Sequence, residues 1–314
     1  MGPEREATPS AGGWLVPPEV SSEVLTLLRA RSAVMRMGVR VVPVRRQLAI
    51  TSVASGASAS YVPENAAAPI SEQTFDQDVL LMPRDLVAMV PVSDRLLRDA
   101  ADNPSVENVV RADVDEVLAL RADLAFLRGA GAGGEPIGIR NTPGLTAAPT
   151  LGTNGRTPTF DDLKDMVAAL RAVNAPFSRP GWVFNGRLLN TLEKVKDTMG
   201  RYLAEAGLLT FDMVGGGGTL LGYPFQTTGQ IPTALTVGSS SDTTEVYFSS
   251  DWNECWIGEE YALTIEASNV ANYWDGTQWV SAWQNRQTVF RAIVTHDIGL
   301  RRPQLFTVMT GVRP

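Results

Sequence analysis

The stretch that decides the fold runs from Gly12 to Ala100, and it contains RVVPVRRQLAI (40–50), SVASGASASYVPENAAAPISEQTF (52–75) and DQDVLLMPRDLVAMVPVSDRLLRDA (76–100). The first and last of these segments have the apolar, β-branched composition of strands. The segment between them is rich in Ala, Ser and Pro, so it lacks the apolar area needed for a core of its own. We therefore predict a long arm that packs on another molecule, which indicates assembly rather than catalysis.

One strand is expected on each side of this arm, over Val39–Ile50 and Asp78–Val92. Pro83 and Pro91 limit the pairing of the second strand, because proline has no N–H to donate to a ladder. That strand is therefore expected at a sheet edge or in a ribbon. Before the arm, the apolar spacing of Glu19–Arg31 predicts a short helix.

A long amphipathic helix is predicted after the arm, because apolar residues recur there at intervals of three and four over about six turns. The expected apolar stripe consists of Val106, Val109, Val110, Val114, Val117, Leu120, Leu124 and Leu127. The glycine-rich run GAGAGG (129–134) then predicts a helix stop followed by a sharp turn.

The second half of the chain mixes helices and strands. Thr159 with Asp162 is typical of a capping box, and it opens a predicted helix before a short strand at Gly181–Asn185. Later strands are expected at Glu245–Ser250, Trp256–Ala267, Gln278–Trp283 and Thr288–Thr295, with a hairpin turn at Asp275-Gly276 and a closing strand in RRPQLFTVMTG (301–311). The absence of a regular βαβ rhythm in the sequence predicts the α+β class.

Composition limits the classes of function. The 314 residues are 44% hydrophobic and carry a net charge of −7, with a pI of about 4.9. Proteins that wrap nucleic acid are usually basic, often with a pI above roughly 9, so tight nucleic-acid binding is not expected. No apolar run in the sequence approaches the roughly 20 residues that span a bilayer. The opening MGPEREATPSAGG lacks the apolar core of a signal peptide, so we expect synthesis in the cytoplasm and no membrane partner.

Catalytic and cofactor motifs are weak in this sequence. Gly215–Gly218 is not followed by GKS or GKT, so a flexible loop is favoured over a phosphate cradle. His296 and Asp297 lack the G-x-S-x-G elbow that would supply a nucleophile, so a structural or interface histidine is favoured. The single cysteine, Cys255, excludes an intramolecular disulfide and is expected in the core. We predict no enzyme activity, no cofactor and no metal.

Acidic pairs, arginine pairs and a group of tryptophans are the charged and aromatic clusters of the sequence. Asp161-Asp162 is expected to complete a helix N-terminus, and Glu259-Glu260 to lie on a solvated strand edge. Arg45-Arg46 and Arg301-Arg302 are expected to form ion pairs between subunits, with phosphate contacts as the alternative. Five tryptophans crowd the last third of the chain, where core packing and subunit contact are both open: Trp252, Trp256, Trp274, Trp279 and Trp283.

The order of the segments resembles that of the major capsid proteins of tailed bacteriophages, which have the Hong Kong 97-type capsid fold. The resemblance covers nearly the whole chain from Gly12. The segments that carry it are GGWLVPPE (12–19), VMRMGVRVV (34–42), VPVSDRLLRDA (90–100), FLRGAGAGGEPIGI (126–139), TFDDLKDMVAALRA (159–172), GWVFNGRLLNTLEKVKD (181–197), TLLGYPFQTTGQIP (219–232), VYFSSDWNECWIGEEYALTIEAS (246–268) and VFRAIVTHDIGLRRPQLFTVMTG (289–311). Each is weak alone, and their order and spacing make the match specific.

This resemblance implies a division of the chain into an N-terminal arm (1–38), an extended loop hairpin (39–92), a peripheral domain with the long spine helix (93–150), an axial domain (151–244) and closing strands shared by both domains (245–314). The extended loop is expected to lie across a neighbouring subunit. Subunit contacts are expected at Arg45, Arg46, Tyr61, Glu64, Glu72, Phe75, Arg84, Arg301 and Arg302.

The implied function is that of a major capsid protein. Hexamers and pentamers of the chain would tile an icosahedral shell around double-stranded DNA, without sequence-specific binding. The protein would be part of the virion and would assemble in the host cytoplasm. A scaffolding protein, a portal and a decoration protein are the further partners that the resemblance suggests.

Two departures from the family pattern matter. Some members join an extended-loop lysine covalently to an asparagine of a neighbour, but 39–92 contains no lysine. Shell stability is therefore expected to be non-covalent or to come from a cementing protein. Many members also carry an N-terminal scaffolding segment that a protease removes, whereas only a short stretch precedes Gly12. Either scaffolding is a separate protein or the numbering describes a processed form.

Three alternatives stay open at this point. An encapsulin-like compartment would share the fold and enclose a cargo enzyme. A capsid of a gene-transfer agent or a prophage would look the same in sequence. A hydrolase or transferase is the enzyme alternative, and the lack of a catalytic constellation in the sequence disfavours it.

Overall fold

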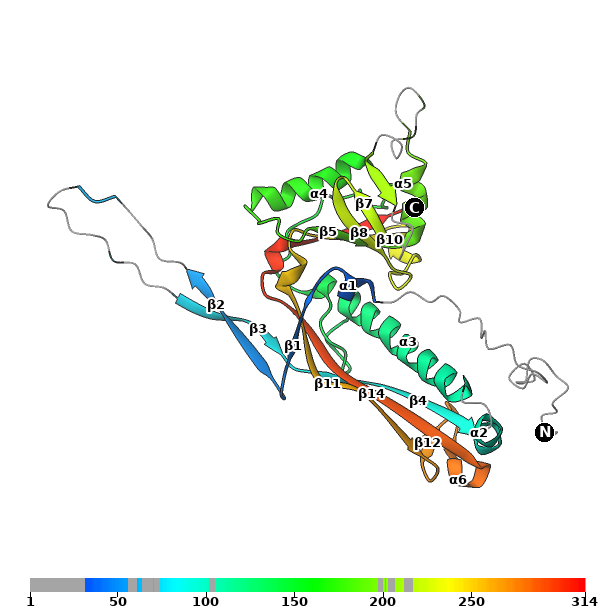
Figure 1. Ribbon diagram of the computed structural model, residues 1–314. Coiled ribbons are helices and arrows are strands. Elements are labelled where there is room, and N and C mark those ends of the chain that lie inside the picture. The colour runs from blue at the N-terminus through cyan, green and yellow to red at the C-terminus, as the bar shows by residue number, and fades with distance from the viewer. Residues whose placement is uncertain are drawn as a thin grey trace.

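The computed structural model describes residues 32–55, 61–63, 70, 74–101, 105–196, 200, 202, 207–211 and 217–313. They form two lobes and a long hairpin that projects from between them (Figure 1). One lobe contains a four-stranded sheet and a long helix, and the other contains a seven-stranded sheet. The architecture is α+β, as the sequence predicts.

The first lobe is built on a sheet whose strands come from both halves of the chain. In order across the sheet they are β1 (Arg40–Pro43), β11 (Cys255–Ser268), β14 (Gln287–Leu300) and β4 (Arg84–Ser93). β1 runs parallel to β11, and the other neighbours are antiparallel. β4 therefore lies at the edge, which confirms the expectation from its prolines. Glu259 pairs with both Pro43 and His296, so it lies inside the sheet and the predicted strand edge is wrong at this residue.

The long helix α3 (Ser105–Arg128) confirms the predicted spine helix and packs on this sheet. Its buried face confirms the predicted stripe at Val114 and Leu127 but not at Val117, and the side chains of Val106, Val109 and Val110 lie outside the described part of the chain. Val114, Leu118 and Phe126 are buried, whereas Val117 is 45% exposed. Ala122 and Ala125 are also buried. The predicted stripe contained only valines and leucines, so it did not include them. Because alanine allows close approach, the helix presents this face to the sheet.

The glycine-rich turn after α3 confirms the predicted helix stop. A side chain at Gly129 would clash with the carbonyl oxygens of Ala125 and Pro136, so only glycine fits there. The carboxylate of Glu135 accepts hydrogen bonds from the backbone N–H of Ala130 at 3.1 Å and from Arg121 at 2.8 Å. Glu135 therefore ties the turn both to its own backbone and to helix α3.

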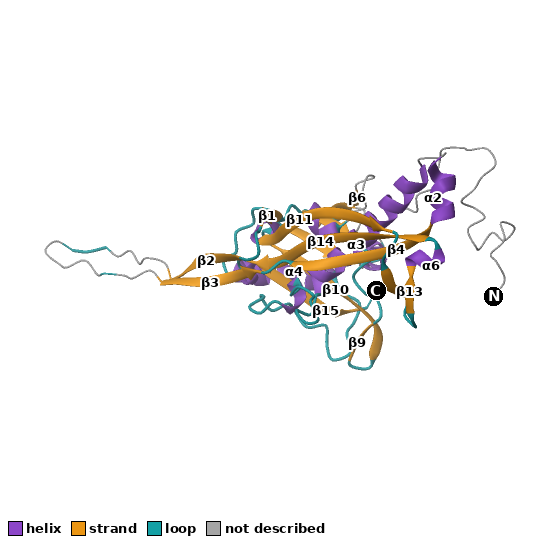
Figure 2. Ribbon diagram, turned by 90° about the horizontal axis from the view of Figure 1, so that it is seen from below, coloured by secondary structure: helices purple, strands orange, loops and turns teal. Residues whose placement is uncertain are grey.

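The projecting hairpin consists of β2 (Leu48–Ser55) and β3 (Thr74–Leu81), which pair with each other as a separate two-stranded sheet. It extends well beyond both lobes (Figures 1 and 2). Each of the two strands expected beside the arm is divided in the structure. The first bends at a turn in which Arg46 has a φ of 68°, and the second bends at Met82–Pro83. The outer parts form the hairpin, and the inner parts, β1 and β4, join the four-stranded sheet.

The second lobe contains the remaining large sheet. Its strand order is β15 (Phe306–Val312), β10 (Ser240–Ser249), β5 (Gly181–Phe184), β8 (Tyr223–Thr227), β7 (Gly217–Leu220) and β6 (Leu209–Phe211), with β9 (Leu235–Val237) paired to β10. Helices α4 (Phe160–Ala172) and α5 (Gly186–Glu193) pack beside it. Gly217 and Gly218 lie in β7, so the predicted loop is wrong for these two glycines, and Gly215 and Gly216 lie outside the described residues.

Aromatic stacking forms the centre of this lobe. Trp182 and Phe248 stack with ring centroids 4.0 Å apart, and Phe184 and Phe225 stack at 5.2 Å. All four side chains are fully or almost fully buried. Such pairs add about 0.5–1.5 kcal/mol each beyond their area burial, so they fix the sheet against α4 and α5.

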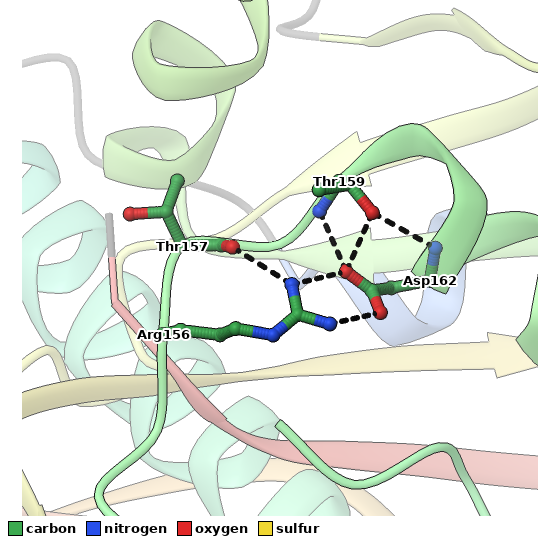
Figure 3. A network of polar contacts seen from close by, with 4 residues as sticks. All are labelled: Arg156, Thr157, Thr159 and Asp162. Carbon is green, nitrogen blue, oxygen red and sulfur yellow. Dashed lines mark hydrogen bonds and ion pairs between the residues drawn. The ribbon is translucent and has the colours of Figure 1, made fainter. Parts of the chain in front are cut away.

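The predicted capping box at the start of α4 is present (Figure 3). The hydroxyl of Thr159 accepts a hydrogen bond from the backbone N–H of Asp162, and the Asp162 carboxylate accepts one from the N–H of Thr159 at 2.7 Å. The guanidinium of Arg156 adds a bidentate contact to the same carboxylate at 2.6 and 2.7 Å. Asp162 therefore completes the helix N-terminus, as expected.

Short elements complete the fold. They are α1 (Ala33–Arg36), α2 (Asp94–Ala101), β12 (Asn272–Trp274), β13 (Trp279–Ser281), α6 (Ala282–Asn285) and the 3-10 turns η2 (Ile139–Asn141), η4 (Trp252–Glu254) and η5 (Pro303–Leu305). The Asp275-Gly276 turn joins β12 to β13, which confirms the predicted hairpin. The strand predicted over Gln278–Trp283 is shorter, because α6 begins at Ala282.

Candidate assembly surfaces

The root of the β2–β3 hairpin is firmly packed. Val44, Val79 and Leu81 form a buried cluster against the ends of β11 and β14. A side chain at Gly299 would clash with Val79, so glycine allows the close approach. The carboxylate of Asp297 accepts a hydrogen bond of 2.7 Å from the backbone N–H of Met82, which fixes the bend at the root. Burial raises the pKa of Asp297.

Several of the expected contact residues belong to the hairpin and its root. Arg45 and Arg46 are exposed in the turn between β1 and β2, and Tyr61 is fully exposed in the loop at the hairpin tip. Phe75 lies on β3 in register with Val53. Glu64 and Glu72 lie outside the described residues. These positions are spread along the hairpin rather than gathered in one site.

The other expected contacts lie on the first lobe. Arg84 is half-buried, pairs in register with His296, and lines a pocket of about 190 Å³ together with Arg121 and Glu135. Arg301 lies 3.8 Å from the carboxylate of Glu254 in its own subunit. Its neighbour in sequence, Arg302, is exposed.

Half-exposed apolar side chains lie both at the hairpin root and on the edge strand β4. Leu80, Met82, Val87 and Met89 are each between 45% and 48% exposed. On the opposite face of β4, Leu86, Ala88 and Val90 pack towards α3. Several exposed apolar side chains on one segment of the chain are typical of a surface that another protein covers.

The tryptophans divide between core and surface. Trp252 is fully buried, and its indole N–H donates to the carbonyl of Gly181 at 3.0 Å. In contrast, Trp274, Trp279 and Trp283 are 54%, 73% and 68% exposed, on β12, β13 and α6 at the far end of the first lobe (Figure 1). We call these three residues the tryptophan tip. Trp274 and Trp279 meet edge to face at 5.6 Å.

His296 and Cys255 show no catalytic arrangement. Cys255 is fully buried, and burial raises the pKa of its thiol well above the ordinary value. His296 packs edge to face on Phe126, with ring centroids 4.9 Å apart, and burial lowers its pKa. Both are therefore structural, as the sequence indicated for the cysteine.

Two buried acidic residues were not predicted from the sequence. Glu245 on β10 is 1% exposed and forms ion pairs with Arg128 at 3.1 Å and Arg140 at 2.7 Å. Asp123 in α3 is fully buried and accepts hydrogen bonds from Ser32 and Thr228. The signal available in the sequence was an aspartate inside an otherwise apolar stretch of the spine helix. Its partners come from segments far away in the chain.

The described residues show neither a metal-ligating cluster nor a membrane-spanning helix. Among the residues that the structure describes, no three His, Cys, Asp or Glu side chains gather in a way that would hold a metal ion. Within the same ranges, no helix has the length and apolar character needed to cross a membrane.

Comparison with known proteins identifies the family. The model of the phage capsid family matches residues 12–311. The major capsid protein of Klebsiella oxytoca phage phiKO2 is 34% identical over 308 residues, which cover 96% of this chain and 69% of that protein. The major capsid protein of Halomonas phage phiHAP-1 is 25% identical over 185 residues, covering 57% of this chain and 29% of that one.

Solved structures share the fold. The capsid of a native GTA particle has a TM-score of 0.69 at 19% identity, with 98% of this chain and 99% of that chain covered. The structure described as Mycobacterium phage Bobi has a TM-score of 0.68 at 15% identity, with 96% and 97% covered. The fold is thus of the Hong Kong 97 type.

The chain belongs to the phage capsid family. It is a major capsid protein of a tailed phage, which is a structural protein and not an enzyme. Proteins of this class assemble with copies of themselves into a shell, so its place is the virion.

Proposed function

We propose that this chain forms hexamers and pentamers that close an icosahedral shell around double-stranded DNA, and that the β2–β3 hairpin joins neighbouring subunits. The observation that carries this proposal is the hairpin itself. It has a buried root and projects beyond both lobes of its own subunit (Figures 1 and 2). An isolated two-stranded ribbon is at best marginally stable in water, so its outer part needs a partner surface.

The partner surface that fits best is the apolar strip of Leu80, Met82, Val87 and Met89 on another copy. A ribbon laid over this strip would cover exposed apolar area, at about 25 cal/mol per Å². Many such modest contacts in one particle reinforce each other through avidity. The domain limits proposed from the sequence need one adjustment for this role, because β2 and β3 form a separate two-stranded sheet while β1 and β4 belong to the four-stranded sheet.

Charged contacts accompany the ribbon. The exposed pair Arg45 and Arg46 at the root, together with Arg84 and Arg302, offers guanidinium groups to carboxylates of a neighbour. Arginine suits such contacts because its planar fork binds a carboxylate bidentately. On the hairpin, Glu64, Glu72, Tyr61 and Phe75 are proposed as the matching contacts, and Arg301 as a contact shared with Glu254 of its own subunit.

We further propose that the shell is held without covalent cross-links from the hairpin. The only lysines of the chain are Lys164, Lys194 and Lys196, so no amide bond can start from a lysine in 39–92. Scaffolding, portal and decoration proteins are the proposed further partners, with assembly in the host cytoplasm. The net charge of −7 suits a container that encloses DNA without sequence-specific binding.

The test is electron microscopy of purified protein, first wild type and then a variant that lacks Ser55–Ile70. Wild type is expected to give closed shells, alone or after addition of lysate from the native source. The deletion variant is expected to stay folded and to form no shells. A matched control replaces 56–60 by a Gly/Ser segment of equal length, which keeps the reach of the hairpin and should assemble.

Two results would contradict the proposal. Normal shells from the deletion variant would show that the hairpin is dispensable. Particles from the native source that contain a cargo protein and no DNA would instead support a compartment of the encapsulin type.

A further inference from the structure

An apolar cluster joins the two lobes. Large side chains from both lobes are fully or almost fully buried in it: Phe126 and Leu127 of α3, Val183 of β5, Tyr247 of β10 and Phe306 of β15. The attraction between apolar surfaces is non-directional, so it holds the lobes together without selecting one angle between them by itself. Directional polar contacts across the joint are needed to select that angle.

The first such contact starts from the spine helix. The carboxylate of Asp123 accepts a hydrogen bond of 2.9 Å from the hydroxyl of Thr228. Thr228 belongs to the second lobe, because it directly follows β8 and its backbone N–H donates to the carbonyl of Phe184 in β5 at 3.1 Å. Asp123 and Thr228 are both buried, so water does not compete for the bond between them.

The second contact runs in the opposite direction. Glu245 of β10, in the second lobe, forms ion pairs with Nε of Arg128 at 3.1 Å and Nε of Arg140 at 2.7 Å. Arg128 ends α3, and the side-chain amide of Asn141 donates to its carbonyl oxygen at 3.0 Å, which ties η2 and Arg140 to the helix. Each lobe therefore contributes one buried carboxylate to donors of the other lobe.

Charge holds the second contact. Oε1 of Glu245 and Nε of Arg128 are buried without an aligned hydrogen bond, so the attraction between the carboxylate and the two guanidinium groups is mainly electrostatic. Such attraction is strong where water is excluded. The hydroxyl of Tyr247 donates to Oε2 of Glu245 at 2.8 Å, and a glutamine at position 245 would still accept this bond. Glu245→Gln therefore removes the charge and keeps the shape.

We propose that Glu245, paired with Arg128 and Arg140, acts with Asp123 to fix the angle between the two lobes, and that this angle sets the curvature of the shell. Asp123 and Arg128 are five residues apart, so the two contacts meet α3 about 7.5 Å apart along its axis. Two separate contacts resist a rotation that a single contact would allow. The inference rests on the proposed shell, in which a change of this angle would tilt neighbours bound to one lobe against neighbours bound to the other.

The angle is measured in the full-length subunit with a spin label on each lobe. Lys164→Cys on α4 and Val270→Cys between β11 and β12 supply the labelling sites, since both positions are exposed, whereas Cys255 is buried and should stay unlabelled. Electron–electron double resonance is expected to give one narrow distance peak for the otherwise wild-type subunit. In Glu245→Gln, the fraction of subunits outside that peak should rise about tenfold, which corresponds to about 1.4 kcal/mol.

Asp242→Asn is the matched control. Asp242 lies on the same strand as Glu245, but its partner Arg313, at 3.0 Å, follows β15 in the same lobe. This variant should keep the narrow peak. Arg140→Gln is the second test variant, because the partly exposed Arg140 side chain can be shortened without opening the core, and it should broaden the distances even if Glu245→Gln does not fold.

Particle diameters from electron microscopy test the link to the shell. The wild-type protein should give one size class, and the variant with broadened distances should give several diameters or open sheets. A narrow peak in both Glu245→Gln and Arg140→Gln, or a broadened peak in Asp242→Asn, overturns the role of Glu245. Broadened distances combined with uniform shells of wild-type diameter overturn the link to curvature. Wild-type protein that forms no shells contradicts the proposed function, whereas the spin-label distances still decide whether Glu245 fixes the lobe angle.

Discussion

The carboxylate of Asp123 in α3 accepts a hydrogen bond of 2.8 Å from the hydroxyl of Ser32. The same carboxylate accepts bonds from the backbone N–H of Val34 at 3.1 Å and from the hydroxyl of Thr228 at 2.9 Å. Asp123 is fully buried. The spine helix, the first described residues and the second lobe therefore meet at one buried charge.

Replacing Asp123 by Ala should lower the free energy of unfolding by about 3 kcal/mol or more, because three buried donors lose their acceptor. Ser32→Ala, which removes only one of the donors, should cost about 1 kcal/mol. Urea unfolding of the isolated subunit at neutral pH measures both. An Asp123→Ala subunit within about 0.5 kcal/mol of wild type would show that the three bonds contribute little.

The Arg156–Asp162 pair predicts a dependence of stability on pH. Burial raises the pKa of Asp162, but the hydrogen bonds from Arg156 and Thr159 outweigh this effect and lower the pKa below its ordinary value of 3.8. A carboxylate with a lowered pKa in the folded state stabilises the fold above its unfolded pKa, and this stabilisation is lost as pH falls through the folded pKa. Arg156→Gln should therefore destabilise the subunit at pH 7, and the difference from wild type should shrink well below pH 3.8.

The control for this pair is Lys164→Gln. Lys164 and Asp161 are separated by 3.8 Å on the same helix, and both are largely exposed, so the variant should change stability little at any pH. A difference between Arg156→Gln and wild type that stays constant from neutral to strongly acidic pH would mean that the pair with Asp162 is not its source.

Gly299→Ala should loosen the root of the hairpin. The added methyl group would clash with Val79, and the cost should be about 1–3 kcal/mol of unfolding free energy. Hydrogen exchange of the β3 amides should accelerate as well. Gly229→Ala is the matched control, because nothing lies within 4 Å of an added Cβ there. Equal protection of β3 in both variants would be evidence that the root is not tightly packed.

The tryptophan tip should contribute to assembly more than to folding. Trp279→Ser combined with Trp283→Ser should lower the unfolding free energy of the isolated subunit by no more than about 1.5 kcal/mol, because both side chains are exposed. Particle yield by sedimentation should fall sharply. Trp252→Ala, at a fully buried position, should instead cost about 3–5 kcal/mol in the subunit. Wild-type particle yield from the double variant would exclude the tip as a contact.

Local sequence patterns predicted much of the fold correctly. The spine helix, the capping box at Thr159 and the hairpin turn at Asp275-Gly276 each follow from spacing or turn chemistry within a few residues, and the structure confirms them. The bends at Arg46 and Met82–Pro83 were missed, because the strands on either side have the same apolar composition. The buried face of α3 was predicted only in part, at Val114 and Leu127, since the rest of it depends on alanines whose role appears only against the sheet.

The assembly surfaces were harder to predict than the elements. Glu245 and its partners Arg128 and Arg140 lie far apart in sequence, so no local signal joins them. The tryptophans of the last third look alike in sequence, yet Trp252 is buried and Trp279 is exposed. Tertiary packing alone separates a core residue from a contact residue of this kind.

A cryo-electron microscopy map of assembled wild-type particles tests the central claim most directly. The account predicts closed shells in which the β2–β3 hairpin of each subunit lies on the first lobe of a neighbour, over Leu80, Met82, Val87 and Met89. Shells in which the hairpin folds back on its own subunit, or points into solvent without touching another copy, would contradict it.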